Sequence, residues 1–192
     1  MKKNIEVEIR GILNKTEFNK AKKFFKEKAK FIEKKRRVLI DYSVFLPGEG
    51  IRSRQRDIRV RVTNDIPEII VKLGSWGGSE SRRELSFMGR KGEFGTLVEI
   101  FGQLGFTKGM RAKRDGLIYT YKGIEFSLIE TPGKNYYFEA EKMAHGKEDF
   151  KKVENKIRKV CEALGLKVLD KEGFYEFVER LNKTENEIFE FS

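Results

Sequence analysis

The chain has very little of several residue types, and each scarcity excludes a class of protein. It contains one cysteine, one histidine, two glutamines and three prolines among 192 residues. A single cysteine excludes an internal disulfide and a multi-cysteine metal site, and it is typical of a reducing compartment. No apolar run approaches membrane-spanning length, and the N-terminus enters an alternating segment without a signal-peptide pattern. We therefore expect a soluble, cytoplasmic protein that is not bound to a membrane.

Charged residues, by contrast, are abundant. Lysine and arginine together number 41 and aspartate and glutamate 30, which gives a formal net charge of +11. Many Lys and Glu residues beside few Gln are typical of heat-adapted proteins, in which ion-pair networks are favoured. The positive balance predicts an anionic partner, either nucleic acid, acidic lipid or a phosphorylated small molecule.

The hydrophobic pattern predicts one α+β domain, residues 1–192, dominated by antiparallel strands. Asn64 to Pro67 separate two alternating runs and predict a hairpin. Strands are expected at 5–12, 36–45, 57–63, 68–74, 81–87, 110–121, 123–130 and 136–142. Helices are expected from Thr16 to about Phe31 and at 91–104, 147–164 and 171–182. The C-terminal helices, 147–182, are expected to pack on the strands.

Several strands carry charges on one face and apolar residues on the other, because side chains alternate along a strand. The first strand places Glu6, Glu8 and Arg10 opposite Val7 and Ile9. The same alternation places Arg59, Arg61, Lys72, Arg82, Glu84, Glu139 and Glu141 on charged faces. Two architectures fit: an open sheet with one solvated face, or a barrel with a charged lumen.

If these faces converge, their chemistry is specific. Arginine and lysine match phosphate oxygens, and arginine offers a bidentate fork. Carboxylates without His or Cys suit a hard cation such as Mg²⁺ or Mn²⁺. Such an ion bridges carboxylates to phosphates, so the mixture predicts a metal–polyphosphate site.

Six short motifs appear in a fixed order along the chain. They are "EVEIR" at the N-terminal end, "RVRV", the lysine of "IIVKLG", "RRELSF", a basic strand at 111–114 and "YFEAEK". This series resembles the CYTH superfamily, the triphosphate tunnel enzymes, over roughly residues 4–182. That superfamily includes class IV adenylyl cyclases, thiamine triphosphatases and inorganic triphosphatases. The tail "LGLKVLDKEGFYEFVERL" is most similar to the class IV cyclase branch.

The resemblance implies a closed eight-stranded antiparallel β-barrel that threads a triphosphate through its lumen, with helices packed outside. It implies roles for residues of this chain by motif. The implied metal ligands are Glu6, Glu8, Glu130, Glu139 and Glu141. The implied substrate-binding residues are Arg10, Arg59, Arg61, Lys72, Arg82, Lys113 and Arg114. The implied catalytic residues are Arg10, Lys72 and Glu84.

The chain departs from the family pattern at three positions. Arg10 stands where the family usually has lysine, and arginine stays protonated, so it is a poor base. Arg111, Lys113 and Arg114 each fit the basic position of their strand. Glu130 best matches the late acidic residue, but a slip of one residue would turn it to the other face.

The resulting prediction is a metal-dependent enzyme that acts on a triphosphate, most similar to a class IV cyclase that converts ATP to cyclic AMP and pyrophosphate. The alternatives are a triphosphatase acting on thiamine triphosphate, a nucleotide or tripolyphosphate, and a non-catalytic nucleotide or polyphosphate binder.

Nucleic acid is a less favoured partner, because the "KKRR" run at 34–37 has no accompanying aromatic motif. A homodimer is compatible with the sequence. Trp76, in a glycine-rich loop, is expected to anchor that loop, with stacking on a base as the alternative.

Overall fold

The structure, a computed structural model, describes residues 4–76, 82–145 and 147–192, and it contains nine strands and four α-helices in this part of the chain. The strands are β1 (Asn4–Leu13), β2 (Lys30–Asp41), β3 (Arg56–Thr63), β4 (Ile66–Leu73), β5 (Arg83–Met88), β6 (Lys108–Tyr121), β7 (Ile124–Glu130), β8 (Tyr136–His145) and β9 (Glu187–Glu190). The helices are α1 (Lys15–Lys28), α2 (Phe94–Gln103), α3 (Lys147–Ala163) and α4 (Lys171–Thr184), with a short 3₁₀ turn η1 (Ser43–Phe45).

All strands belong to one sheet with the order β1-β8-β7-β6-β2-β3-β4-β5, and β9 pairs with β6. The strands pair antiparallel in β1–β8, β7–β8, β6–β7, β6–β9, β2–β3, β3–β4 and β4–β5. The predicted α+β class with an antiparallel sheet is therefore confirmed. The hydrogen-bonded order begins at β1 and ends at β5 among the described residues, so closure into a barrel stays a prediction.

The chain divides into two compact units, each with its own core. The first unit contains the described residues of 1–35 and 115–174, and the second contains 36–76, 82–114 and 175–192. The strands β2 and β6 and the helix α4 contribute residues to both units.

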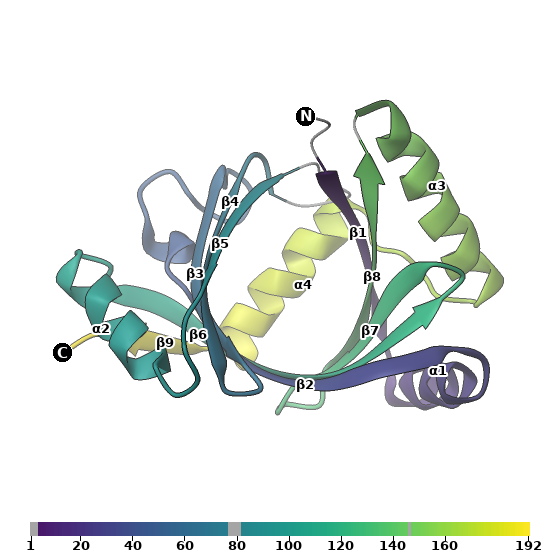
Figure 1. The fold of residues 1–192 in the computed structure, drawn as a ribbon, viewed down its shortest axis with the longest axis horizontal. Coiled ribbons are helices and arrows are strands. Elements are labelled where there is room, and N and C mark those ends of the chain that lie inside the picture. Colours follow the sequence, from purple (N-terminus) through teal and green to yellow (C-terminus); the bar gives the residue numbers. More distant parts are fainter. Residues whose placement is uncertain (1–3, 77–81, 146) are drawn as a thin grey trace. The chain divides into compact units, whose positions relative to one another are not determined.

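In the first unit, α1 and α3 cover the apolar face of β1, β7 and β8 (Figure 1). The helix α1 begins at Lys15 because Asn14 and Glu17 form a reciprocal capping box, so it starts one residue before the predicted start at Thr16. Its buried stripe, Phe18, Ala21 and Phe25, packs on Val7 and Ile9 of β1 and on the core residues of β7 and β8. Cys161 of α3 is fully buried in the same core.

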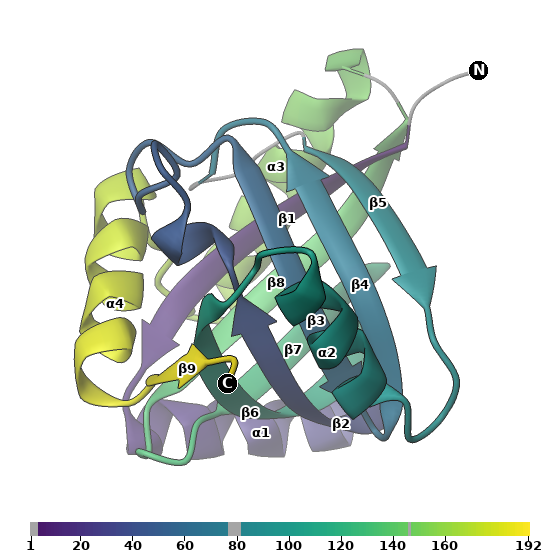
Figure 2. The same cartoon turned by 90° about the vertical axis from the view of Figure 1, so that its left-hand side faces the viewer.

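In the second unit, α2 packs against β3 and β4 (Figure 2). A smaller core joins Val60 of β3 to Leu97 and Phe101 of α2 and to Ile40 and Tyr42. The predicted hairpin is confirmed, with a two-residue turn at Asn64 and Asp65. Both residues have positive φ, +48° and +70°, which Asn and Asp tolerate better than most residues and which a tight hairpin of matching twist requires.

The structure differs from the sequence prediction at the ends of some elements. β2 begins at Lys30 and ends at Asp41, so it starts earlier than predicted, and η1 follows where a strand was expected. The short strand β9 was not predicted. No helix in the described residues is both long and apolar enough to cross a membrane.

Candidate functional site

The first unit carries a face of carboxylates on β1, β8 and β7, which we call the acidic face: Glu6, Glu8, Glu125, Glu139 and Glu141. It arises from strand register, since Glu8 pairs with Glu141 and Arg10 with Glu139 across β1 and β8. The alternate residues Val7 and Ile9 are buried in the core, so the carboxylates must lie on the opposite side. Four of the five predicted metal ligands, Glu6, Glu8, Glu139 and Glu141, are therefore brought onto one face.

Arg10 is held inside this acidic face by two of its carboxylates. Its Nη2 lies 2.6 Å from Glu8 Oε1, and its Nε donates to Glu139 Oε1 at 3.0 Å. Burial alone would lower the pKa of Arg10, but Glu8 and Glu139 outweigh it and raise the pKa above its ordinary value. The guanidinium also lies over the ring of Phe174, 4.8 Å from its centroid. Arg10 is thus a fixed cation rather than a base.

Glu125 was missed by the sequence prediction, although it completes a row of three carboxylates. The register of β7 places it opposite Glu141, which itself lies opposite Glu8. Burial, together with repulsion from Glu8, Glu6, Glu125 and Glu139, raises the pKa of Glu141 to about 9. A carboxylate in this position favours a proton or a cation as its neighbour.

Glu130 is not brought to the acidic face. It lies five residues after Glu125 on β7, which puts it on the face of Phe126 and Leu128, both buried in the core. Its partner is Lys134, whose Nζ donates to Glu130 Oε1 at 2.6 Å. This is the one-residue slip that the sequence left open.

The structure of β6 distinguishes the three residues that fit the basic position of this strand, Arg111, Lys113 and Arg114, by the face on which each lies. Lys113 and Arg111 both lie toward Glu187 of β9, at 3.9 and 4.0 Å. Arg114 lies on the other side of the strand, with Ala112 and Gly116. The two predicted substrate-binding residues of this strand, Lys113 and Arg114, therefore lie on opposite faces of the sheet.

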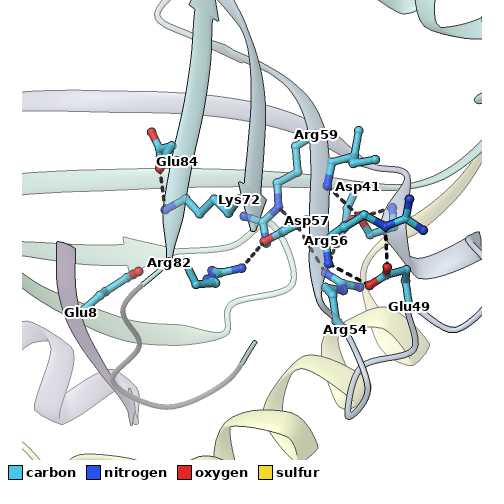
Figure 3. Close-up of polar contacts among 12 residues, drawn as sticks. Glu8, Asp41, Glu49, Arg54, Arg56, Asp57, Arg59, Lys72, Arg82 and Glu84 are labelled. Carbon is cyan, nitrogen blue, oxygen red and sulfur yellow. Dashed lines mark hydrogen bonds and ion pairs between the residues drawn. The ribbon is translucent and has the colours of Figure 1, made fainter. Parts of the chain in front are cut away.

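The second unit carries a group of arginine and lysine side chains on β3, on β4 and at the residue before β5, which we call the basic face: Arg59, Arg61, Lys72 and Arg82. Each cation lies beside a carboxylate of the same unit. Figure 3 shows those of Arg59, Lys72 and Arg82. Arg61 donates to Glu68 Oε2 at 2.7 Å, and Lys72 Nζ lies 2.9 Å from Glu84 Oε2. The predicted residues Arg59, Arg61, Lys72, Arg82 and Glu84 all belong to this part of the unit.

Asp57 connects two of the predicted phosphate-binding arginines and was not predicted. Arg59 approaches it with a bidentate fork, Nε to Oδ1 at 2.7 Å and Nη2 to Oδ2 at 2.6 Å. Arg82 Nη1 donates to Oδ2 at 3.1 Å. Burial would raise the pKa of Asp57, but the attraction of Arg59, Arg54 and Arg82 is larger and holds that pKa below its ordinary value.

Arg54 and Asp41 lie behind this fork. Arg54 Nη1 lies 2.7 Å from Asp41 Oδ2 and 3.5 Å from Asp57 Oδ1. The Arg54 side chain is 1% exposed and its guanidinium lies 4.3 Å from the centroid of Trp76. Burial raises the pKa of Asp41, although Arg54 opposes this. The prediction that Trp76 anchors its loop agrees with this position, since the ring is buried against Arg54 and Tyr175.

The acidic face has the donor chemistry of a hard-cation site, because it offers carboxylates and no His or Cys. Within residues 4–76, 82–145 and 147–192, however, no three His, Cys, Asp or Glu side chains are grouped closely enough to enclose a metal ion. Magnesium is commonly held by one or two carboxylates, with substrate phosphates and water completing its shell. The acidic face fits that mode of binding, with Glu8 and Glu139 already engaged by Arg10.

Solved structures from several organisms share this fold. The PH1819 protein of Pyrococcus horikoshii superposes with a TM-score of 0.73 and 21% identity, over 91% of this chain and 98% of that one. A candidate adenylate cyclase of Vibrio parahaemolyticus gives 0.61 and 15%, over 84% and 89%. HpAC1 of Hippeastrum, a candidate adenylyl cyclase described as having a dominant triphosphatase activity, gives 0.56 and 12%, over 92% and 96%. At these identities the likeness shows the fold alone.

A comparison with curated proteins gives no match. The model of the CYTH domain matches residues 4–175, which is most of the chain and contains both the acidic and the basic face. The six ordered motifs of the sequence lie inside that span. The chain belongs to the CYTH domain family.

Proposed function

We propose that this protein is a divalent-metal-dependent enzyme that acts on a triphosphate compound. The observation that carries the proposal is the pairing of two Glu-x-Glu strands, which puts Glu8 opposite Glu141 and Arg10 opposite Glu139 on one face. Membership of the CYTH family supports the same chemistry. In this proposal Glu6, Glu8, Glu139 and Glu141 hold Mg²⁺ or Mn²⁺, and Glu125 takes the place predicted for Glu130.

The cations of the basic face are proposed to bind the phosphate chain. Arg59 and Arg61 offer planar guanidinium groups that match phosphate oxygens, and Arg82 adds a third. Their side chains are held by Asp57 and Glu68, so they are already ordered before a ligand arrives. Arg114 is the proposed contributor from β6, because Lys113 lies toward Glu187 on the other face. The predicted closed barrel, with these groups lining its lumen, is part of the proposal.

The chemistry proposed is phosphoryl or nucleotidyl transfer. A bound Mg²⁺ or Mn²⁺ would neutralise phosphate charge as a P–O bond breaks. Lys72, oriented by Glu84 at 2.9 Å, supplies a fixed positive charge to the same oxygens. Arg10 orients Glu8 and Glu139 and takes no proton, because its guanidinium stays charged.

Two reactions use this arrangement, and they differ in the attacking group. In the cyclase reaction, which we favour from the resemblance of the tail, the ribose 3′-hydroxyl attacks the α-phosphate and pyrophosphate leaves. In the triphosphatase reaction, water attacks the terminal phosphate, the diphosphate is the leaving group, and the attacked phosphate is released as inorganic phosphate. A non-catalytic nucleotide or polyphosphate binder is the further alternative. The ion pairs of Arg10 with Glu8 and Glu139 favour this alternative, because they compete with binding of a catalytic metal ion by these two carboxylates.

A product assay tests the proposal. The full chain is incubated with Mg²⁺ or Mn²⁺ and ATP, thiamine triphosphate or tripolyphosphate, and products are separated by ion-exchange chromatography. Cyclic AMP with pyrophosphate supports the cyclase, and free phosphate supports the triphosphatase. Binding of a triphosphate without turnover at any metal concentration would support the non-catalytic binder. A protein that shows no binding and no turnover would overturn the proposal.

The proposal includes the setting expected from the sequence. The protein is proposed to act in the cytoplasm, since its one cysteine is a buried free thiol. The catalytic domain is proposed to span residues 1–192 and to form a homodimer, with no nucleic acid or membrane required. Size-exclusion chromatography with light scattering measures the assembly directly.

A further inference from the structure

Asp57 lies at the centre of the cations of the second unit, on the same face of β3 as Arg59 (Figure 3). It accepts both donors of the Arg59 fork and one donor from Arg82, and Arg54 lies 3.5 Å from its Oδ1. Its side chain is 1% exposed, whereas that of Arg59 keeps 22% exposure. The carboxylate is therefore buried beneath a guanidinium that solvent can still reach.

The base of this cluster is itself fixed. Arg54 is held by Asp41 on one side and by the Trp76 ring on its flat face. Asp41 also accepts from the backbone N–H of Ser43 at 3.0 Å, and the Trp76 carbonyl accepts from the Tyr175 hydroxyl at 2.5 Å. These contacts tie the cluster to η1 and to α4, so Asp57 has little freedom to move.

We propose that Asp57 is a positioning residue that fixes the guanidinium groups of Arg59 and Arg82 for binding a chain of phosphates. This inference rests on the proposed function. A freely rotating arginine side chain loses considerable rotamer entropy when it binds an anion, whereas an arginine side chain already held by a carboxylate loses less. Asp57 therefore favours phosphate binding although it carries the same sign of charge as the ligand.

The two effects of Asp57 predict opposite signs for its removal. The cluster of Arg54, Arg59, Arg82, Asp41 and Asp57 carries three positive and two negative charges, so it has a net charge of +1. If charge alone mattered, Asp57→Asn would raise this to +2 and tighten anion binding. If positioning dominates, the same change weakens binding, because an amide NH2 replaces one of the two acceptor oxygens and the Arg59 fork and the Arg82 contact can no longer both form.

The test is a double-mutant cycle followed by isothermal titration calorimetry. The full chain in Mg²⁺-containing buffer is titrated with tripolyphosphate, as wild type, Asp57→Asn, Arg59→Ala and the double variant. We expect each single change to weaken binding about tenfold, the typical effect of a lost charge-assisted hydrogen bond. The loss of affinity in the double variant should be clearly smaller than the product of the two single losses, because Asp57 acts in part through Arg59 and in part through Arg82.

Glu49→Gln is the matched control. Glu49 is a buried acid of the same unit that pairs with Arg56, a residue outside the basic face, with Nε to Oε1 at 2.7 Å. This variant removes the same charge and should change the affinity less than about twofold. Urea unfolding of every variant establishes that the protein titrated is folded.

Each outcome decides a separate point. Equal or tighter binding by folded Asp57→Asn, or additive losses in the double variant, overturns the inference and leaves the proposed function standing. Wild-type protein that binds neither tripolyphosphate nor ATP overturns both.

A measurement on the wild type covers the case in which Asp57→Asn does not fold. The Nε–H of Arg59 should exchange with solvent more slowly than that of exposed Arg83 in ¹⁵N NMR spectra, since it donates to a buried carboxylate. The Arg59 signal is assigned by its loss in Arg59→Lys. Equal exchange rates at the two arginines would show that the hydrogen bonds between Arg59 and Asp57 do not persist in solution, and this result would overturn the inference.

Discussion

At the scale of single residues, Glu8 and Glu139 combine two roles. Each binds Arg10, and each is a proposed ligand of the metal ion. We expect Glu8→Gln and Glu139→Gln each to lower kcat by about 100-fold or more at saturating Mn²⁺, because the remaining amide oxygen is a poor ligand for a hard cation. Steady-state rates measured over a Mn²⁺ titration check this.

Glu27→Gln is the control for these two variants, since it removes a carboxylate from the exposed side of α1. Its kcat should equal that of the wild type. Near-wild-type kcat in both Glu8→Gln and Glu139→Gln would remove these carboxylates from the metal site, whatever their effect on stability.

The face on which a side chain lies was predictable from sequence where the alternation of one strand decided it. Glu6, Glu8, Glu139 and Glu141 share a face because of spacing within their own strands. The position of Glu130 relative to the acidic face depends on how β7 pairs with β8, and residue spacing alone does not give that register. Glu125 was missed for the same reason. Asp57 was missed because its partner Arg82 is 25 residues away, on another segment.

At the scale of elements, β1 requires glycine at one position. A Cβ on Gly11 would overlap the carbonyl oxygen of Lys167 and the ring of Phe138, so the segment before α4 can approach β1 only because this side chain is absent. We expect Gly11→Ala to destabilise the protein by about 1–3 kcal/mol, the usual cost of overpacking. Urea denaturation monitored by circular dichroism measures it.

Gly95→Ala provides the comparison, since a Cβ at this position of α2 meets no atom within 4 Å. Alanine is the better helix former, so this variant should be neutral or more stable by up to about 1 kcal/mol. A Gly11→Ala variant as stable as Gly95→Ala would contradict the close approach of the 167 segment to β1.

Most elements were predictable because their apolar period was long and regular. The stripes of α1 and α3 and the alternation of β1, β3 and β8 gave both the type and the buried face. Short segments lacked that signal. β9 has only four residues. In β2, Phe31 and Ile32 are followed by five charged residues, Glu33 to Arg37, so no apolar alternation marks the start of the strand.

At the scale of the whole molecule, the acidic face links folding stability to pH. Glu141 has a pKa of about 9 in the fold, against roughly 4.3 in an unfolded chain. The folded state thus holds the proton more tightly, so stability is lost as pH rises from about 4 toward 9. In metal-free buffer, Glu141→Gln should match the wild type near pH 4 and exceed its Tm near pH 8.5 by about 2–4 °C, which corresponds to about 1 kcal/mol.

Thermal unfolding of both proteins across this pH range, with Glu27→Gln as the exposed control, tests the expectation. Added Mg²⁺ or Mn²⁺ should narrow the difference at high pH, because a bound cation would replace the proton as the partner of Glu141. A Tm difference that is the same at pH 4 and pH 8.5 would show that Glu141 does not titrate in this environment.

The position of Trp76 has a practical consequence. It is the only tryptophan in the chain, and its indole lies against Arg54, one ion pair away from Asp57 and the Arg59 fork. Indole emission responds to the charge and packing around the ring, so the protein contains an intrinsic optical reporter beside its proposed anion-binding arginines. Ligand screening by fluorescence therefore needs neither an attached dye nor an engineered reporter.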